Sequence, residues 1–231
     1  MIQIRKSEDR GRLKIDWLEA RHTFSFGNYY DPKHNHFEHL RVLNEDKISA
    51  GGGFDTHPHE NMEIFTFIIS GELKHQDSMG NGAVIKAGDI QYMAAGSGVY
   101  HSEFNPSSNE TCHLLQMWVI PNKKDVAPRY EQTRYSLEEK RGKFICFASD
   151  DGRNGSFKIN RNATISVSYL TDKDICVYRL EGKAIWVQVA SGSVVLNGQM
   201  LNQGDGASAK DCSELVFEQA KEADLILFDF K

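Results

Sequence analysis

Residues 51–63 read GGGFDTHPHENME, and the histidine pair His57 and His59 in this stretch decides how the chain is interpreted. Residues i and i+2 of a β-strand point to the same face, so the two imidazoles are expected to project together from one strand. Two imidazoles on one strand form half of a site for a transition metal ion. An HxH pair alone is common on protein surfaces, so a metal site requires a second group of ligands elsewhere in the chain.

The stretch 98–105, GVYHSEFN, supplies that second group. His101 and Glu103 are again two positions apart, and they share a face if the segment is a strand. If this strand lies beside the first, three imidazole nitrogens and one carboxylate oxygen converge. The sequence therefore predicts a site for one divalent transition metal at His57, His59, His101 and Glu103.

Short runs of β-branched and aromatic residues recur along the chain, separated by clusters of Gly, Asn, Asp and Ser. The Asn197-Gly198 pair between apolar runs is typical of a tight hairpin. The helix signal is weak, apart from a short helix expected near residues 136–140. This pattern predicts an all-β fold of sandwich or barrel type. The expected strands include residues 64–69, 114–120, 144–147, 164–170, 185–189, 194–196 and 225–230.

The polar segment 122–141 divides the chain into two expected β domains, residues 1–134 and 135–231. An SG turn followed by a GD turn occurs in each half, which indicates similar folds. All nine histidines lie at or before His113. Only the first domain is therefore expected to hold an imidazole metal site.

Composition narrows the classes of function. The 231 residues carry a net charge of -5, which argues against direct binding to nucleic acid. The N-terminal residues show no signal-peptide pattern, and no apolar run is long enough for a membrane span. The four cysteines form no CxxC pair, which is typical of reduced thiols. We therefore expect a cytoplasmic protein without direct nucleic-acid or membrane contacts.

These motifs resemble a known family. Residues 51–63 and 88–105 resemble the two cupin motifs, and more specifically HPH at 57–59, HQDSMG at 75–80 and GVYHSE at 98–103 resemble the pirin family. Trp17-Leu18 and the HTFSF stretch at 22–26 add to the resemblance, which is strong over about residues 10–130 and looser beyond. It implies a bicupin fold of two β-barrel, jelly-roll cupin domains, of which only the N-terminal one holds metal.

The resemblance also implies the ligand set His57, His59, His101 and Glu103. The broader cupin pattern uses the carboxylate at the position of Glu63, so Glu63 is retained as an alternative ligand or a residue behind the ligands. Nitrogen and carboxylate donors suit several metals, and ligand type alone cannot choose among them. The resemblance favours Fe(II), with Ni, Co, Mn, Cu and Zn as alternatives.

Pirin-like proteins resemble quercetin dioxygenases, which implies an oxidoreductase that cleaves flavonols such as quercetin with O2 and releases carbon monoxide. Glu103 is the expected catalytic base for the flavonol hydroxyl, with a plain ligand role as the alternative. Gln116 and Trp118, on one strand face, and Phe24 and Phe26 are candidates for pocket walls. The competing hypothesis is a metal-binding regulatory or redox-sensing protein that acts through a protein partner.

The remaining histidines are expected to play no part in the metal site. His113 is out of phase with Gln116 and is expected to be a hydrogen-bonded core or surface residue. His75 lies beside a turn and is expected in solvent. No role is assigned to the histidines of the loop-like N-terminal stretch, His22, His34, His36 and His39.

Overall fold

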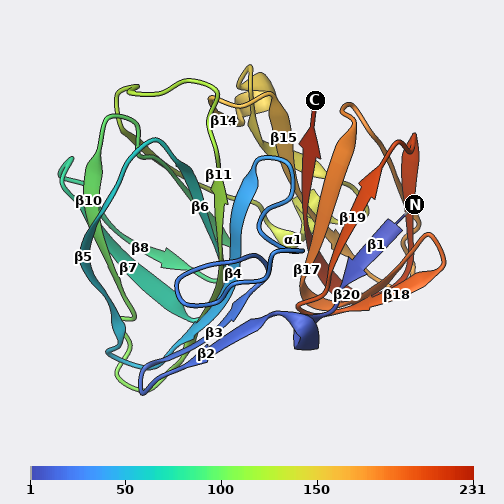
Figure 1. Ribbon diagram of the computed structural model, residues 1–231. Coiled ribbons are helices and arrows are strands. Elements are labelled where there is room, and N and C mark those ends of the chain that lie inside the picture. Colours follow the sequence, from blue (N-terminus) through green and yellow to red (C-terminus); the bar gives the residue numbers. More distant parts are fainter. Residues whose placement is uncertain (1) are drawn as a thin grey trace. The chain divides into compact units, whose positions relative to one another are not determined.

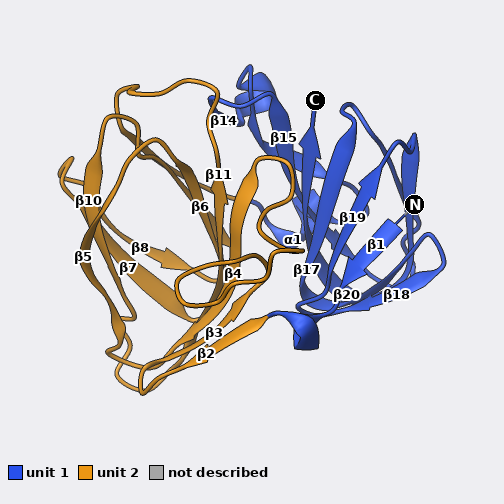
Figure 2. Cartoon of the chain, viewed as in Figure 1, with its two compact units in different colours: residues 1–10, 135–231 blue, residues 11–134 orange. Residues whose placement is uncertain are grey.

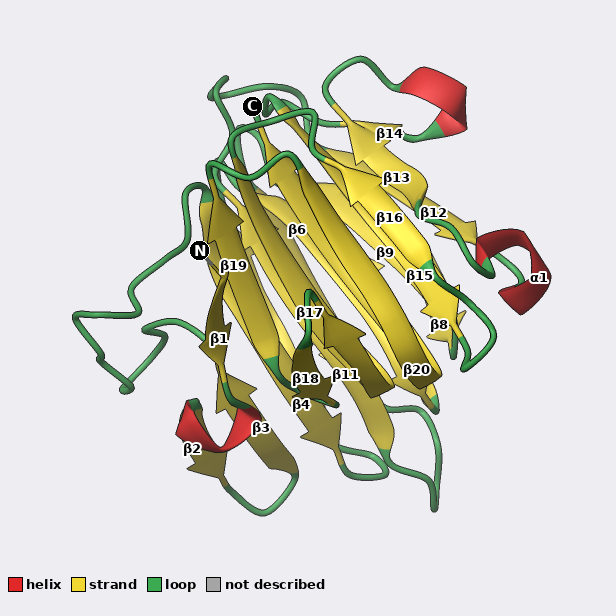
Figure 3. Cartoon of the chain, turned by 90° about the vertical axis from the view of Figure 1, so that its right-hand side faces the viewer, coloured by secondary structure: helices red, strands yellow, loops and turns green. Residues whose placement is uncertain are grey.

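A computed structural model describes residues 2–231, and strands form nearly all of its regular structure (Figure 1 and Figure 3). The all-β class is therefore confirmed. The expected short helix is α1 (Leu137–Lys140), which begins with a reciprocal cap between Ser136 and Glu139. Two 3₁₀ turns, η1 (Ser7–Asp9) and η2 (Arg153–Gly155), complete the helical structure. No described helix is long and apolar enough to cross a membrane.

The chain forms two compact units, coloured separately in Figure 2. Residues 11–134 (orange) form the histidine unit. Residues 2–10 together with residues 135–231 (blue) form the composite unit. The composite unit thus includes residues 2–10, whereas the expected boundary places them in the N-terminal domain.

The histidine unit consists of a seven-stranded sheet, in the order β12-β9-β6-β11-β4-β3-β2, and a four-stranded sheet, in the order β5-β10-β7-β8. All strand pairs in both sheets are antiparallel. The strands are β2 (Gly11–Lys14), β3 (Leu18–His22), β4 (Leu40–Ile48), β5 (Gly53–His59), β6 (Glu63–Ser70), β7 (Glu72–Asp77), β8 (Gly82–Lys86), β9 (Asp89–Ala94), β10 (Val99–Phe104), β11 (Cys112–Val119) and β12 (Arg129–Arg134).

A row of polar side chains crosses the larger sheet of the histidine unit. The register places His22 opposite Asn44, Asn44 opposite Gln116, Gln116 opposite Thr66 and Thr66 opposite Gln91. Residues directly opposite on neighbouring strands share a face, so the row lies on one side of the sheet. Gln116 bonds Glu103 of the smaller sheet, which shows that this is the side between the sheets. An apolar cluster that includes Leu18, Ile48, Ile68, Leu73, Ile85 and Leu114 packs beside the row.

The composite unit is built on a nine-stranded sheet with the main order β1-β19-β17-β20-β15-β13-β14, to which β16 and β18 are attached. Alternating apolar residues of β17 and β20, such as Val187 and Leu225, form its core. Its strands are β1 (Ile2–Arg5), β13 (Ile145–Ser149), β14 (Phe157–Lys158), β15 (Ala163–Leu170), β16 (Cys176–Arg179), β17 (Ala184–Leu196), β18 (Gln199–Asn202), β19 (Gly206–Lys210) and β20 (Glu214–Phe230).

The N-terminal strand joins this sheet because it pairs with a strand from the far end of the sequence. Ile2 to Arg5 lie opposite residues 206–209 of β19. Lys6 then forms a 2.8 Å ion pair with Asp205, and the Ser7 amide donates to the same carboxylate at 2.8 Å. The four cysteines are free thiols, as expected.

Candidate metal centre

The two strands that carry the histidine motifs are neighbours. β10 pairs with β5 in antiparallel register, with His101 opposite His57 and Val99 opposite His59. The register shifts between His101 and Glu103, so a bulge separates the last two candidate ligands. Gly53 lies so close to the Glu103 carbonyl and the Phe104 ring that a Cβ at this position would clash. The glycine before the histidine pair therefore permits the close approach of β5 to β10.

Three imidazoles meet on this pair of strands. Ring nitrogens of His57, His59 and His101 all lie within 4.8 Å of one another. The Nε2 atoms of His57 and His101 are 3.0 Å apart. His59 packs edge-on against His57 and against Trp118, with ring centroids 4.8 Å away in each case. Its ring nitrogens make no hydrogen bond to any residue within 2–231.

Hydrogen bonds on the far sides of two rings assign their tautomers. His57 Nδ1 lies 2.7 Å from the Asp55 carbonyl oxygen, which can only accept, so Nδ1 carries the proton. His101 Nδ1 lies 3.4 Å from His75 Nδ1, and His75 Nε2 lies 3.2 Å from Asp77 Oδ2. With His75 neutral and donating to Asp77, its Nδ1 accepts from His101. The Nε2 atoms of His57 and His101 thus face each other as two lone pairs.

The electrostatics keep two of these rings, those of His59 and His101, uncharged. Burial, followed by the neighbouring His101 and His57, lowers the pKa of His59 to about 4. Burial, followed by His57 and His75, lowers the pKa of His101 to about 3. Neutral imidazoles are the form that binds metal. At neutral pH these nitrogens are therefore available without loss of a proton.

Glu103 belongs to a second, overlapping group. Ligand atoms of His75, His101 and Glu103 lie within 4.8 Å of one another, and all three residues are buried. Gln116 donates to Glu103 Oε2 at 2.8 Å and accepts from the Trp118 indole at 3.2 Å. Glu103 Oε1 is buried and has no hydrogen-bond partner in the described chain. A buried carboxylate oxygen without a donor is costly, unless a cation or a ligand approaches it.

The expectation that His75 lies in solvent is wrong. His75 is fully buried on β7, where its ring stacks on Tyr130 with centroids 4.7 Å apart. The register places it opposite Glu103, and Asp77 opposite His101. His75 and Asp77 are two positions apart and so share a strand face, a signal that the sequence carried but that the nearby turn obscured.

Glu63, the alternative carboxylate, is not in either group of candidate ligands. It lies buried on β6, where it accepts a hydrogen bond from the Tyr92 hydroxyl. Strand alternation does not continue from His59 to Glu63, because Asn61 adopts a φ of 50° and turns the chain between β5 and β6. The other histidines bond elsewhere: His22 to Asn44, His34 to Asp31, His36 to Glu38 and His113 to Glu45.

A cavity of about 260 Å³ opens beside the cluster, and we call it the inner cavity. His57, His59 and Glu103 line one part of it, and Gln116 and Trp118 line another. Phe26 also contributes, with its ring 5.5 Å from that of Trp118. Phe24, in contrast, is buried and does not line this space. The inner cavity thus joins a polar, nitrogen-rich end to aromatic walls.

Comparison with known proteins identifies the family. The family model described as Pirin matches residues 3–119, and the model described as quercetinase C-terminal cupin domain matches residues 146–230. The chain belongs to the pirin family. The bicupin architecture is thereby confirmed, as is the resemblance to quercetin 2,3-dioxygenases, which are oxidoreductases.

Relatives of this pirin match over the whole chain. A quercetin 2,3-dioxygenase of Escherichia coli K12 is 41% identical over 99% of this chain and 98% of the relative. A pirin-like protein of Caulobacter vibrioides is 35% identical over 99% of both chains. The crystal structure of the bacterial pirin YhhW from E. coli in complex with nickel(II) superimposes with a TM-score of 0.94, at 40% identity, and covers 100% of this chain and 99% of that one.

The donor set of this pirin fits a transition metal. Metal–nitrogen bonds of about 2.0–2.1 Å hold two imidazole nitrogens on one ion about 3 Å apart, and the His57 and His101 Nε2 atoms are separated by 3.0 Å. The unpartnered Glu103 oxygen supplies a buried anionic donor. Each of His57 and His101 also donates its second ring N–H to another group, as metal-binding histidines usually do.

Proposed function

We propose that this pirin is a metal-dependent dioxygenase that cleaves flavonols such as quercetin with O2 and releases carbon monoxide. One observation carries the proposal: three imidazoles and a buried carboxylate with one oxygen that has no hydrogen-bond partner lie at one end of an aromatic-walled cavity. Such a combination suits a planar substrate that bears an acidic hydroxyl group. The names of the relatives point to the same substrate class.

His57, His59, His101 and Glu103 are the proposed ligands of one divalent ion, for which Fe(II) is our first choice. Nickel is the main alternative, because a related bacterial pirin was solved with nickel(II). Manganese, cobalt, copper and zinc also accept three nitrogens and one oxygen. When bound here, such an ion would supply Lewis acidity toward a substrate hydroxyl and a centre for the chemistry of O2.

The side chains have separate tasks in this reaction. Glu103 accepts the hydroxyl proton of the flavonol, and Gln116 holds this side chain in place through a hydrogen bond to its Oε2. The anion left on the substrate is the electron-rich species that reacts with O2. Trp118 and Phe26 contact the faces of the planar substrate and exclude water from it. His75 and Asp77 orient the His101 ring through its second nitrogen.

The deciding experiment is O2 uptake with quercetin, using Fe(II)-loaded protein whose metal content has been measured. We expect uptake and loss of the flavonol absorption band in proportion to bound metal. His101→Ala should lose metal and uptake together, whereas Glu103→Gln should retain part of its metal and lose at least about 100-fold in rate.

Stoichiometric metal without turnover would contradict the proposal. In that case the favoured hypothesis becomes a metal-binding regulatory protein that acts through a protein partner. The cytoplasmic location stays a prediction.

A further inference from the structure

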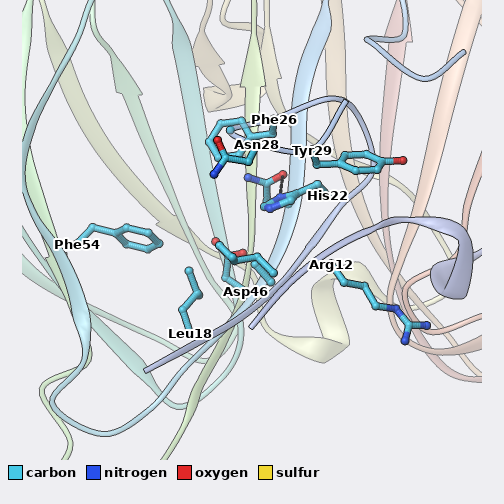
Figure 4. Close-up of a pocket in the computed structure, with 12 residues that line it drawn as sticks. Arg12, Leu18, His22, Phe26, Asn28, Tyr29, Asp46 and Phe54 are labelled. Atoms are coloured by element: carbon cyan, nitrogen blue, oxygen red, sulfur yellow. Dashed lines mark hydrogen bonds between the residues drawn. The ribbon is translucent and has the colours of Figure 1, made fainter. Parts of the chain in front are cut away.

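A second cavity lies within the histidine unit, beside the inner cavity, and we call it the outer cavity. Its volume is about 400 Å³. Figure 4 shows Phe54 on one side of this space and Phe26, Asn28 and Tyr29, from the loop after β3, on the others. Leu18 and Ala20 of β3 and His22 at its end form part of the lining. None of the proposed metal ligands lines it.

The two cavities share a wall. Phe26, Asn44, Asp46 and Phe54 line both of them, so the two cavities adjoin at these side chains. The inner cavity, at about 260 Å³, is smaller than the range of about 300–1,000 Å³ usual for pockets that bury a drug-sized ligand. A ligand of several fused or linked rings that reaches the metal end would therefore have to extend into the outer cavity.

The lining of the outer cavity defines what would fit there. Phe26 and Phe54 present aromatic surface, and Leu18 and Ala20 add aliphatic surface. Its polar groups include His22 and Asn44, which lie at one end of the row of polar side chains across the larger sheet. Asn44 accepts from His22 Nδ1 at 3.0 Å through its Oδ1, and its Nδ2 amide makes no hydrogen bond to any described residue. Asn44 is 3% exposed, so this amide is a buried donor at the wall between the two cavities.

Charge restricts the ligand further. The carboxylate of Asp46 is 4% exposed and lines both cavities. In a buried setting it would repel an anionic substituent, whereas it accepts hydrogen bonds from hydroxyl groups. Arg12 also belongs to the lining, but it is exposed and its guanidinium group points away from the other lining side chains (Figure 4). The outer cavity therefore suits an uncharged aromatic ring that carries hydroxyl or carbonyl oxygen.

The loop that closes this space is held by its own contacts. Arg41 donates to the Ser25 carbonyl at 2.7 Å, and His34 and Asp31 form a 2.7 Å pair. The backbone amides and carbonyls of Phe26 and Tyr29 bond each other at 3.0 Å in both directions. The wall that carries Phe26 and Asn28 is thus formed before any ligand arrives, which lowers the entropic cost of binding.

We propose that the outer cavity is the second compartment of the substrate site. It receives the part of a planar, uncharged, oxygen-substituted aromatic ligand that projects beyond the inner cavity, with Asn44 as the hydrogen-bond donor at the junction. The inference rests on the proposed function, because it assumes that the metal-binding part of the ligand occupies the inner cavity.

The test compares two probes that share a metal-binding hydroxy-ketone but differ in length: 3-hydroxy-4-pyranone, with one ring, and 3-hydroxyflavone. Binding of each to metal-loaded protein is titrated without O2 by absorption, so that turnover is not needed. Asn28→Trp fills the outer cavity from an exposed loop position, and Ala20→Val fills it from the opposite strand. Lys33→Trp places the same bulk at an exposed position outside the lining.

In the wild type, 3-hydroxyflavone should bind at least about tenfold more tightly than the pyranone, as expected from burial of one further aromatic ring. Asn28→Trp and Ala20→Val should each weaken flavone binding by about fivefold or more and leave pyranone binding unchanged, and Lys33→Trp should change neither.

Equal affinity of both probes for the wild type, or flavone binding that neither filling variant weakens, would overturn the second compartment. The proposed dioxygenase would survive that result, because it is tested separately by O2 uptake of the metal-loaded wild type with quercetin. Failure of both probes to bind metal-loaded wild type would overturn both proposals.

Discussion

The Nε2 atoms of His57 and His101 lie 3.0 Å apart with a lone pair on each side of the gap. The bond from His57 to the Asp55 carbonyl and the contact between His101 and His75 take up the ring protons on the far sides. Two opposed lone pairs repel each other, and this repulsion is relieved when a cation lies between them. The apoprotein is therefore built around a position for positive charge.

Replacement of His57 tests this position directly. We expect His57→Ala to lower metal affinity at least about 100-fold, because it removes one of three converging nitrogens. Metal content after dialysis, measured by elemental analysis, reports the change. His113→Ala is the matched control, since His113 bonds Glu45 and lies outside both candidate clusters. Equal metal content in His57→Ala and the wild type would refute the ligand assignment.

His75 should matter for metal binding although it is not among the proposed ligands. Loss of its contact with His101 in His75→Ala frees that ring to rotate and to change tautomer, so metal affinity should fall about 10–100-fold. A competition titration with a coloured chelator measures the affinity. His36→Ala removes an exposed imidazole and should have no effect. An unchanged affinity in His75→Ala would show that the contact does not position His101.

Gln116 should affect the reaction more than the metal. Gln116→Leu removes the donor to Glu103 Oε2, and a hydrogen bond to a charged group contributes about 1.5–3 kcal/mol. O2 uptake per bound metal should fall roughly 10–100-fold, with metal content close to that of the wild type. Loss of metal in proportion to loss of rate would instead assign Gln116 to the support of a plain ligand.

Asp77 should make stability depend on pH. Burial raises its pKa, but hydrogen bonds from Asn81, His75 and Met79 outweigh burial and lower the pKa below its ordinary value of 3.8. A carboxylate with a lowered pKa stabilises the fold above its unfolded pKa, and this contribution is lost as pH falls through the folded value. Asp77→Asn should therefore cost about 2 kcal/mol at pH 7 and progressively less toward pH 3.

Urea unfolding of the metal-free protein at several pH values measures this difference for Asp77. Asp16→Asn, at an exposed turn position, provides the comparison. A cost that is the same at pH 7 and pH 3 would rule out ionisation of Asp77 as its origin.

Removal of residues 2–10 should destabilise the composite unit and leave the histidine unit unchanged. Without β1, the edge of β19 loses its partner, and Asp205 loses Lys6 and the Ser7 amide. Thermal unfolding should show a lowered transition for the composite unit, whereas metal content should stay unchanged because His57, His59, His101 and Glu103 all belong to residues 11–134. Loss of metal in the truncated protein would contradict this independence.

Local sequence patterns predicted the features that depend on strand periodicity. Alternation placed His57 and His59 on one face, and the pairing of β5 with β10 then brought His101 to them. The error on His75 has a different origin, since its burial depends on the register between β7 and β10, which no local pattern specifies. The position of Glu63 away from the candidate ligands likewise depends on a single left-handed residue, Asn61, that interrupts the strand before it.

The pairing of the first strand could not be predicted for a related reason. Its partner, β19, lies more than two hundred residues away, as the pairing of Ile2 with Ala209 shows. Pairing over such a separation leaves no trace in a short window of sequence. The composite unit could therefore be predicted as a β structure, but the inclusion of residues 2–10 in it could not.

This division of the chain has a consequence for biosynthesis. The histidine unit is one continuous stretch, so it can fold and acquire its metal while the ribosome is still translating the remainder. The composite unit has to wait, because β1 precedes the histidine unit in the chain and its partner β19 follows it. Until β19 has been synthesised, β1 is an unpaired β-strand tethered to a unit that has already folded.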